Sequence, residues 1–196
     1  MYTHAFLALG ATVLLTASAQ SNAAPANAAA THAAATAGAV RDGSHDFDFW
    51  FGQWTSVHHK LKHRLAHSDE WEDFTGTAIA RPLLGGRANT DENVFHSGTA
   101  GAAGIAFRTY DPGKDLWSIY WVGTTSYTVD APMVGRFVDG VGTFYADDTW
   151  EGKPVRVRFI WSKMDLTHCH WEQAFSTDGG KTWETNWLMD FTRTAF

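Results

Sequence analysis

The residues best suited to chemistry in this 196-residue chain are polar side chains embedded in segments that are otherwise aromatic or β-branched. A charge enclosed in such a segment is costly unless it is paired or used for function. The candidates are Glu92, Arg108, Arg158, Glu172, Gln173 and Asn186. Such groups could orient a small molecule or, for the carboxylates, act in acid–base catalysis. They could equally form a buried network that only fixes strand register.

Strand alternation in the segment 168–175 decides which of its polar residues could face an interior. Trp171 and Phe175 fall on the same face as Gln173, with Cys169, whereas Glu172 and His170 fall on the other. The opposite register would make Glu172 and His170 the inward pair. We favour Gln173 inward, with Arg108, Tyr110 and Arg158 completing a polar patch in an aromatic cavity. The predicted ligand-binding residues are Glu92, Arg108, Tyr120, Arg158, Trp171, Gln173 and Asn186.

Two groups of histidines were considered as metal ligands. His58, His59, His63 and His67 lie close in sequence among basic residues. On a strand His59 and His63 share a face but are separated by Leu61, too far apart to share an ion easily, whereas His59, His63 and His67 would align on a helix. An exposed, solvated strand and loop is the favoured interpretation. His168 and His170 share a strand face with Glu172, a pattern that can supply metal ligands but more often does not. We predict no metal and no cofactor.

The segment Ser176–Trp183 fits the Asp-box pattern Ser-x-Asp-x-Gly-x-Thr-Trp, in which Ser and Asp bond back to a hairpin turn. A single copy cannot build the blades of a propeller, so a structural turn is predicted rather than sialidase chemistry. The chain contains no nucleophile elbow, phosphate-binding loop or dinucleotide fingerprint. An enzyme would therefore have to depend on groups such as Glu92, Glu172 or a histidine.

The sequence pattern predicts that these residues lie on short strands. Aromatic and β-branched segments alternate with Gly, Asp and Pro clusters, and none shows a sustained helical apolar period. Tight-turn sequences between segments favour antiparallel neighbours, and so many short strands must close to protect their edges. We predict an all-β fold, a single antiparallel up-and-down barrel of about ten strands. The expected strands are 54–64, 70–80, 88–95, 104–110, 116–122, 133–137, 142–146, 155–161, 168–175 and 183–192.

The N-terminal part of the chain differs in character from the rest. Residues 1–19 carry no charged side chain and end in Ala17-Ser18-Ala19, which predicts a signal peptide and an exported, periplasmic or secreted protein without stable membrane insertion after processing. The alternatives are a retained anchor, because the n-region has little positive charge, and cleavage beyond Ala19. Residues 20–44 are rich in alanine and predict a disordered linker. The barrel domain is expected at residues 45–196. The net charge of −6 argues against nucleic acid as a partner.

Gly52-Gln53-Trp54, opening the first strand, resembles the Gly-x-Trp pattern of lipocalin-like (calycin) barrels, in which an Arg of the last strand packs across the Trp. Arg193 is suitably placed for that role. The whole of residues 45–196 resembles an uncharacterised family of exported bacterial lipocalin-like domains, which implies a fold and export but no activity. Nitrobindin-like haem barrels are more distant in shape, and no residue here matches their His ligand. The further resemblance is carried by Asp46–Phe49, Asn89–Glu92, Phe107–Pro112, Trp117–Trp121, Trp171–Ser176 and Asn186–Arg193.

These observations favour a barrel that binds a small hydrophobic or aromatic molecule, because Trp and Tyr are abundant at strand positions. One alternative is an isomerase, cyclase or hydrolase that acts on a small metabolite through a cavity Glu or Arg. Another is a structural envelope protein whose barrel is filled by its own side chains. The sequence does not choose an oligomeric state.

Overall fold

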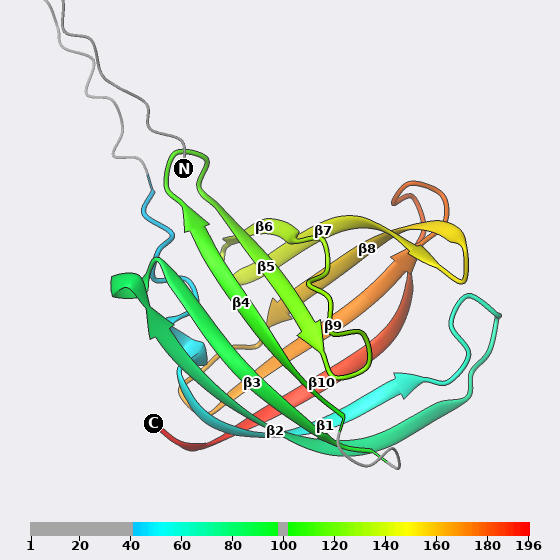
Figure 1. Cartoon of the computed structure of the whole chain (residues 1–196), viewed down its shortest axis with the longest axis horizontal. Coiled ribbons are helices and arrows are strands. Elements are labelled where there is room, and N and C mark those ends of the chain that lie inside the picture. The colour runs from blue at the N-terminus through cyan, green and yellow to red at the C-terminus, as the bar shows by residue number, and fades with distance from the viewer. Residues whose placement is uncertain (1–40, 98–101) are drawn as a thin grey trace, which may run out of the picture. The chain divides into compact units, whose positions relative to one another are not determined.

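The computed structural model describes residues 41–97 and 102–196, so the predicted signal peptide and most of the predicted linker lie outside the described residues. Ten antiparallel strands close into one barrel, confirming the predicted fold class (Figure 1). The strands are β1 (Gly52–Leu61), β2 (Trp71–Leu83), β3 (Ala88–His96), β4 (Ala103–Asp111), β5 (Leu116–Gly123), β6 (Met133–Val138), β7 (Val141–Trp150), β8 (Lys153–Ser162), β9 (His168–Ser176) and β10 (Glu184–Ala195). Two short 3-10 segments, Asp48–Trp50 and Leu84–Gly86, complete the described secondary structure.

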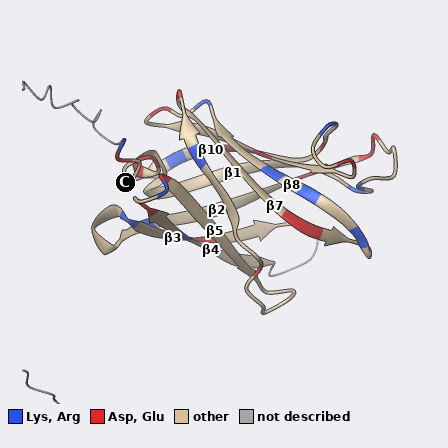
Figure 2. Ribbon diagram, turned by 90° about the horizontal axis from the view of Figure 1, so that it is seen from above, with Lys and Arg blue, Asp and Glu red and all other residues tan. Residues whose placement is uncertain are grey.

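Each strand pairs with its neighbours in sequence, and β1 also pairs with β10. Most predicted strand bounds agree with the structure, but β7 runs four residues beyond Ala146. Its extension contains Asp147 and Asp148, which pair with Arg156 and Val155 of β8. Figure 2 shows this acidic stretch of β7 beside basic positions of β8. Charged residues weaken the sequence signal for a strand, and cross-strand pairing of opposite charges restores its stability.

Two hairpins use an acidic residue followed by glycine. Asp139 and Gly140 join β6 to β7 with φ of 49° and 75°, and Glu151 and Gly152 join β7 to β8 with φ of 48° and 78°. Left-handed backbone at both central positions is the type I′ geometry, whose twist matches that of the flanking strands. The hairpins therefore fix the register of β6, β7 and β8.

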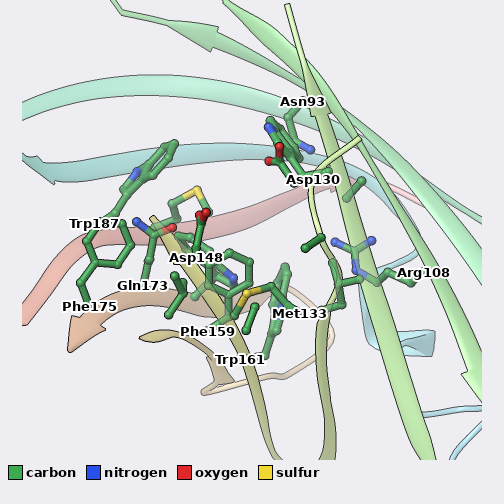
Figure 3. A pocket seen from close by; sticks show the side chains of 18 of the residues that line it. Asn93, Arg108, Asp130, Met133, Asp148, Phe159, Trp161, Gln173, Phe175 and Trp187 are labelled. Atoms are coloured by element: carbon green, nitrogen blue, oxygen red, sulfur yellow. The ribbon is translucent and has the colours of Figure 1, made fainter. Parts of the chain in front are cut away.

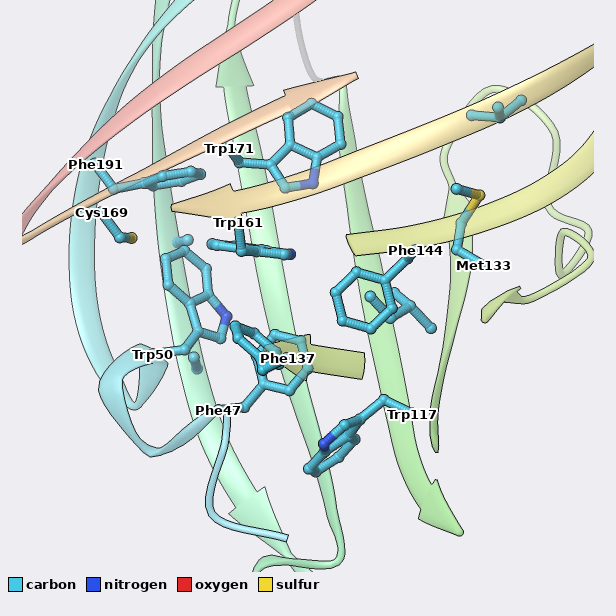
Figure 4. Close-up of a cluster of buried hydrophobic side chains, with 14 of the residues drawn as sticks. Phe47, Trp50, Trp117, Met133, Phe137, Phe144, Trp161, Cys169, Trp171 and Phe191 are labelled. Atoms are coloured by element: carbon cyan, nitrogen blue, oxygen red, sulfur yellow. The ribbon is translucent and has the colours of Figure 1, made fainter. Parts of the chain in front are cut away.

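One end of the barrel is plugged by the segment that precedes β1. Phe47 and Trp50 are almost completely buried, and the Phe47 ring packs edge-on against Trp117 and Phe137 with ring centroids 5.0 Å apart in each pair. Figure 4 shows these rings meeting Trp161 and Phe144 inside the barrel. Packing of this kind stabilises the closed end through both buried area and aromatic geometry.

The predicted contact between the first and last strands is present. The Arg193 guanidinium carbon lies 4.1 Å from the centre of the Trp54 ring, and Arg193 donates hydrogen bonds to the carbonyl oxygens of Phe49 and Phe51. Gly52 has a φ of 122°, and a Cβ there would lie 2.5 Å from the carbonyl oxygen of Ala195. Glycine is therefore required where β1 and β10 meet the plug.

Residues just before His45 also contact the barrel. The Gly43 amide donates to the Tyr110 hydroxyl at 2.8 Å, and the Trp117 indole donates to the Gly43 carbonyl at 3.0 Å. Residues 41–44, expected in the linker, thus belong to the plug. No helical segment within residues 41–97 or 102–196 has the length and apolarity needed to cross a membrane.

Candidate ligand-binding cavity

A cavity of about 500 Å³ lies inside the barrel and begins at the plug. It extends from Trp50 to Arg64 and Asp130, which lie in the β1–β2 and β5–β6 connections at the opposite end of the strands. Inward alternation of the strands makes its wall mainly apolar. The large apolar lining residues are Phe95, Ile119, Trp121, Met133, Trp150, Val157, Phe159, Trp161, Trp171, Phe175, Trp187, Met189 and Phe191.

A polar network closes the deep end of the cavity, next to the plug. Arg108 of β4 forms a buried ion pair with Asp91 of β3, and its Nη1 also donates to Asn89 Oδ1 at 3.0 Å. The Asp91 carboxylate further accepts hydrogen bonds from the Trp50 indole, at 3.1 Å, and from the Asn93 amide. All four polar residues have at most 9% of their surface exposed. The carboxylate is therefore fully engaged by donors.

The Arg108 guanidinium is only partly engaged. Among the described residues, Arg108 donates hydrogen bonds only from Nη1, and its Nε is buried without a partner. Its carbon lies 5.0 Å from the centre of the Phe47 ring and 5.8 Å from that of Trp161. The aromatic contacts and the Asp91 carboxylate hold the cation in place, while donor capacity remains at the cavity wall.

A second polar group lies on the opposite wall, nearer the open end. Gln173 of β9 lines the cavity and donates from Nε2 to Asn186 Oδ1 at 2.8 Å. Asn186 is fully buried on β10 behind it, and its own amide nitrogen lies 3.5 Å from the Glu184 carbonyl oxygen. Because a carbonyl can only accept, Asn186 must turn its nitrogen toward Glu184 and its oxygen toward Gln173. Gln173 is thereby left with its own carbonyl oxygen unused by the described residues.

Charged side chains surround the open end. The Arg64 guanidinium carbon lies 4.9 Å from the centre of the Trp150 ring, 5.6 Å from that of Phe175 and 5.8 Å from that of Trp187. Burial lowers the pKa of Arg64 from its ordinary value. Burial also raises the pKa of Asp130, with a further contribution from the Asp148 carboxylate. The opening is thus polar while the wall is aromatic.

Of the seven predicted ligand-binding residues, Arg108 and Gln173 lie at the cavity wall (Figure 3). Trp171 also lines the cavity, and Asn186 lies behind Gln173, whose amide donates to it. Trp171, Gln173 and Phe175 point inward, and Glu172 and His170 lie on the other face, which is the favoured register. Asn186 is predicted to line the cavity, but it lies outside the lining and contacts the cavity residue Gln173 through a hydrogen bond.

Glu92, Tyr120 and Arg158 lie outside the cavity, contrary to expectation. Glu92 is exposed because its strand neighbours Asp91 and Asn93 take the inward positions. Arg158 lies on the outer face, with its guanidinium carbon 4.5 Å from the centre of the Trp183 ring and its Nη2 3.8 Å from Glu172. Tyr120 packs on the outer face, with its ring centre 6.3 Å from that of Phe107.

Sequence reasoning missed Asp91, the partner of Arg108. Asn89, Asp91 and Asn93 alternate along β3, so all three share the inward face of the strand. Three polar residues at this spacing in a barrel strand were the available signal. The sequence predicts Glu92 as the inward carboxylate, but Glu92 faces solvent and Asp91 faces the interior.

His58 was expected in an exposed stretch, but only 1% of its surface is exposed. Its ring stacks on Phe74 at 4.4 Å between ring centres, Nε2 lies 2.8 Å from Ser56 Oγ, and Nδ1 accepts from the Trp187 indole at 3.1 Å. The indole can only donate, so the proton of the neutral ring resides on Nε2. Burial, with the charges of Lys60 and His96, lowers the pKa of His58 to about 4.

The other histidines considered as metal ligands make local contacts. His59 pairs with Asp73 at 2.6 Å and stacks on Trp71, and His170 pairs with Asp190 at 2.7 Å. Within the described ranges, no three His, Cys, Asp or Glu residues gather in a way that could hold a metal ion.

The Asp-box segment forms the predicted turn between β9 and β10. Ser176 donates to Asp178 Oδ1 at 2.7 Å, and that oxygen accepts from the amides of Lys181 and Thr182, both at 2.9 Å. The Trp183 indole donates to the Gly180 carbonyl at 3.0 Å. These hydrogen bonds strongly lower the pKa of Asp178. The segment is structural, because its polar atoms are engaged within the turn.

Comparison with solved structures relates this barrel to Rv2717c from Mycobacterium tuberculosis. The two share 9% sequence identity with a TM-score of 0.55, over 79% of this chain and 99% of that chain. This likeness supports the closed barrel fold and extends no further. No family model matches the sequence, and no curated protein matches it.

Proposed function

We propose that this protein binds a small, largely apolar or aromatic molecule inside the barrel. The observation that supports this function is the 500 Å³ cavity walled by Trp and Phe side chains, with polar groups from β4 and β9 converging on it. Ligand pockets commonly have this volume and this balance of apolar wall and few polar anchors. The interior is packed at the plugged end and hollow beyond it, which favours binding over a barrel filled by its own side chains.

The enzyme alternative loses its candidate carboxylates, because Glu92 and Glu172 lie outside the cavity. Asp91 lies inside it but is held by Arg108, Trp50 and Asn93. The Asp91 carboxylate is thus used to hold this network together. The carboxylates left for an acid–base role are Asp130, Asp147 and Asp148, which line the cavity near its opening, and the sequence predicts none of them as catalytic.

Titration with the neutral fluorescent dye N-phenylnaphthylamine, alongside a panel of apolar aromatic molecules, tests this function. We expect saturable fluorescence and a rise in the unfolding temperature of the full chain. Ala146 lines the cavity, so Ala146→Phe should fill it and abolish the signal. Val57 is 59% exposed on the outside of β1, and Val57→Phe is the matched control. Equal dye binding by both variants would place the dye elsewhere and contradict the proposal.

We also propose that the protein belongs to an exported lipocalin-like family, as the Gly-x-Trp pattern and the stacked Arg193 suggest. The exported form should begin at Gln20, after the Ala17-Ser18-Ala19 site. Expression of the whole chain in a bacterial host, followed by cell fractionation and mass measurement of the product, tests this. Recovery of only the full-length chain in the cytoplasm would count against export.

A further inference from the structure

Arg108 and Gln173 face each other across the cavity. In the closed order of ten strands, β4 and β9 are separated by four strands in either direction, so they form opposite walls. Figure 3 shows the two side chains on opposite sides of the cavity. Arg108 lies next to the plug through its contacts with Phe47 and Asp91, and Gln173 lies farther along the barrel beside Phe175. The two polar groups are thus separated both across and along the cavity.

Arg108 offers unused donors at the deep end. Nη1 of Arg108 makes all of the described hydrogen bonds of that side chain, whereas both oxygens of Asp91 already accept. Arg108 lines the cavity, so a ligand acceptor there could pair with the donors that its hydrogen bonds to Asp91 and Asn89 leave unused.

The charge at the deep end is already balanced. Arg108 contributes one positive charge, and Asp91 contributes one negative charge in direct contact with it. A ligand carboxylate would bring a second, uncompensated negative charge into a site with almost no exposure to water. A neutral acceptor such as a carbonyl oxygen would gain the same hydrogen bonds without that cost.

The group nearer the opening has the opposite character. The hydrogen-bond chain from Gln173 through Asn186 to the Glu184 carbonyl fixes the direction of each amide and turns the Gln173 oxygen into the available acceptor. Asn186 thus acts as a positioning residue for Gln173. The aromatic rings of Phe159 and Trp171, with centroids 4.7 Å apart, line the same region of the wall.

Building on the proposed binding function, we infer that the ligand is a neutral aromatic molecule with two polar groups at opposite ends. A carbonyl-type oxygen accepts from Arg108 at the deep end, and a hydroxyl or N–H donates to Gln173 nearer the opening. The aromatic body lies between them against Phe159, Trp161 and Trp171.

Five naphthalene probes test this inference by calorimetric titration of the full chain. An acetylnaphthol with its acetyl and hydroxyl groups at opposite ends carries both polar groups. Acetylnaphthalene lacks the donor, ethylnaphthol lacks the carbonyl, ethylnaphthalene lacks both, and a hydroxynaphthoic acid replaces the ketone by an anion. We expect the acetylnaphthol to bind tightest, with about a tenfold loss for each missing polar group. The acid should bind more weakly than the ketone.

Two variants assign each polar group to its partner. Gln173→Leu should remove the advantage of the hydroxyl and keep that of the carbonyl. The double variant Arg108→Met with Asp91→Asn keeps the site neutral and should do the reverse. Thermal unfolding checks that each variant is folded, and the ranking of probes on the unaltered protein needs no variant.

The outcomes separate this inference from the function on which it rests. If none of the five probes binds, the proposed binding function is contradicted. If ethylnaphthalene binds as tightly as the acetylnaphthol, the cavity binds aromatic molecules but the assignment of polar groups is overturned. If the acid binds tightest, the deep end accepts an anion and the neutral ligand class is wrong.

Discussion

At the scale of single residues, the buried His58 makes the free energy of unfolding depend on pH. Its folded-state pKa of about 4 lies below the ordinary value of 6.5. Between these two values the unfolded chain binds a proton on His58 and the folded protein does not. The free energy of unfolding should therefore be fully retained above pH 6.5 and fall as pH drops toward 4. Between pH 7.5 and pH 5 the loss from this group is about 2 kcal/mol.

Urea unfolding of the protein and of His58→Gln at pH 7.5 and pH 5 measures this loss of stability. The variant should be less stable at pH 7.5 because it disturbs the contacts with Ser56 and Trp187, yet it should lose less stability on acidification. His63 is exposed, and His63→Gln is the control that should leave the pH dependence unchanged. The same acid sensitivity in His58→Gln as in the unaltered protein would show that His58 is not the group responsible.

Arg193 is the residue that joins the last strand to the plug. Arg193→Ala removes the stacking on Trp54 and the hydrogen bonds to the carbonyl oxygens of Phe49, Phe51 and Leu166. We expect it to lower the free energy of unfolding by about 3 kcal/mol. Arg193→Lys keeps the charge but loses the planar fork, so it should recover only part of the loss. Full stability in Arg193→Ala, measured by urea unfolding, would mean that the contact does not stabilise the barrel.

At the scale of elements, the turn between β9 and β10 depends on the ionised Asp178 carboxylate. Its pKa is lowered by the hydrogen bonds it accepts, so its contribution to stability is present above the unfolded-state pKa of 3.8 and is lost as pH falls below that value. Asp178→Asn should therefore be less stable than the unaltered protein at pH 7, and the difference should shrink toward pH 2. Thermal unfolding across this range measures it. The exposed Asp69 serves as control, and a pH-independent difference for Asp178→Asn would contradict the expected role of the charge.

The strands were predictable because their signal is local. Aromatic and β-branched segments between turn sequences identified ten strands. The contact of Trp54 with Arg193 was implied by the resemblance of Gly52-Gln53-Trp54 to the lipocalin-like pattern. The inward face of β9 was also predictable, since Trp171 and Phe175 shared it with Gln173. The facing of β3 was missed, because Asp91 and Glu92 are adjacent carboxylates and a shift of one residue exchanges them, although the alternation of Asn89, Asp91 and Asn93 pointed to the observed face. Burial of His58 likewise depends on Phe74, Phe95 and Trp187, which come from three other strands.

At the scale of the whole molecule, the barrel divides its interior between stability and binding, and β7 contributes to both parts. Phe144 lies at the plugged end with no surface exposed, and its ring packs against Phe47 and Phe137. Ala146, two residues along the same face, lines the cavity. The small side chain of Ala146 leaves space in the cavity, whereas the large ring of Phe144 fills the space at the plugged end.

Two substitutions on this one strand face should therefore have opposite effects. Phe144→Leu leaves a void in the packed end and should lower the free energy of unfolding by about 1–2 kcal/mol, with little change in dye affinity. Ala146→Phe occupies empty space and should abolish binding while leaving stability nearly unchanged. Urea unfolding and N-phenylnaphthylamine titration of both variants measure the two quantities independently. If each variant altered stability and affinity together, the packed and hollow parts of the barrel would be energetically coupled, and the interior could not be divided in this way.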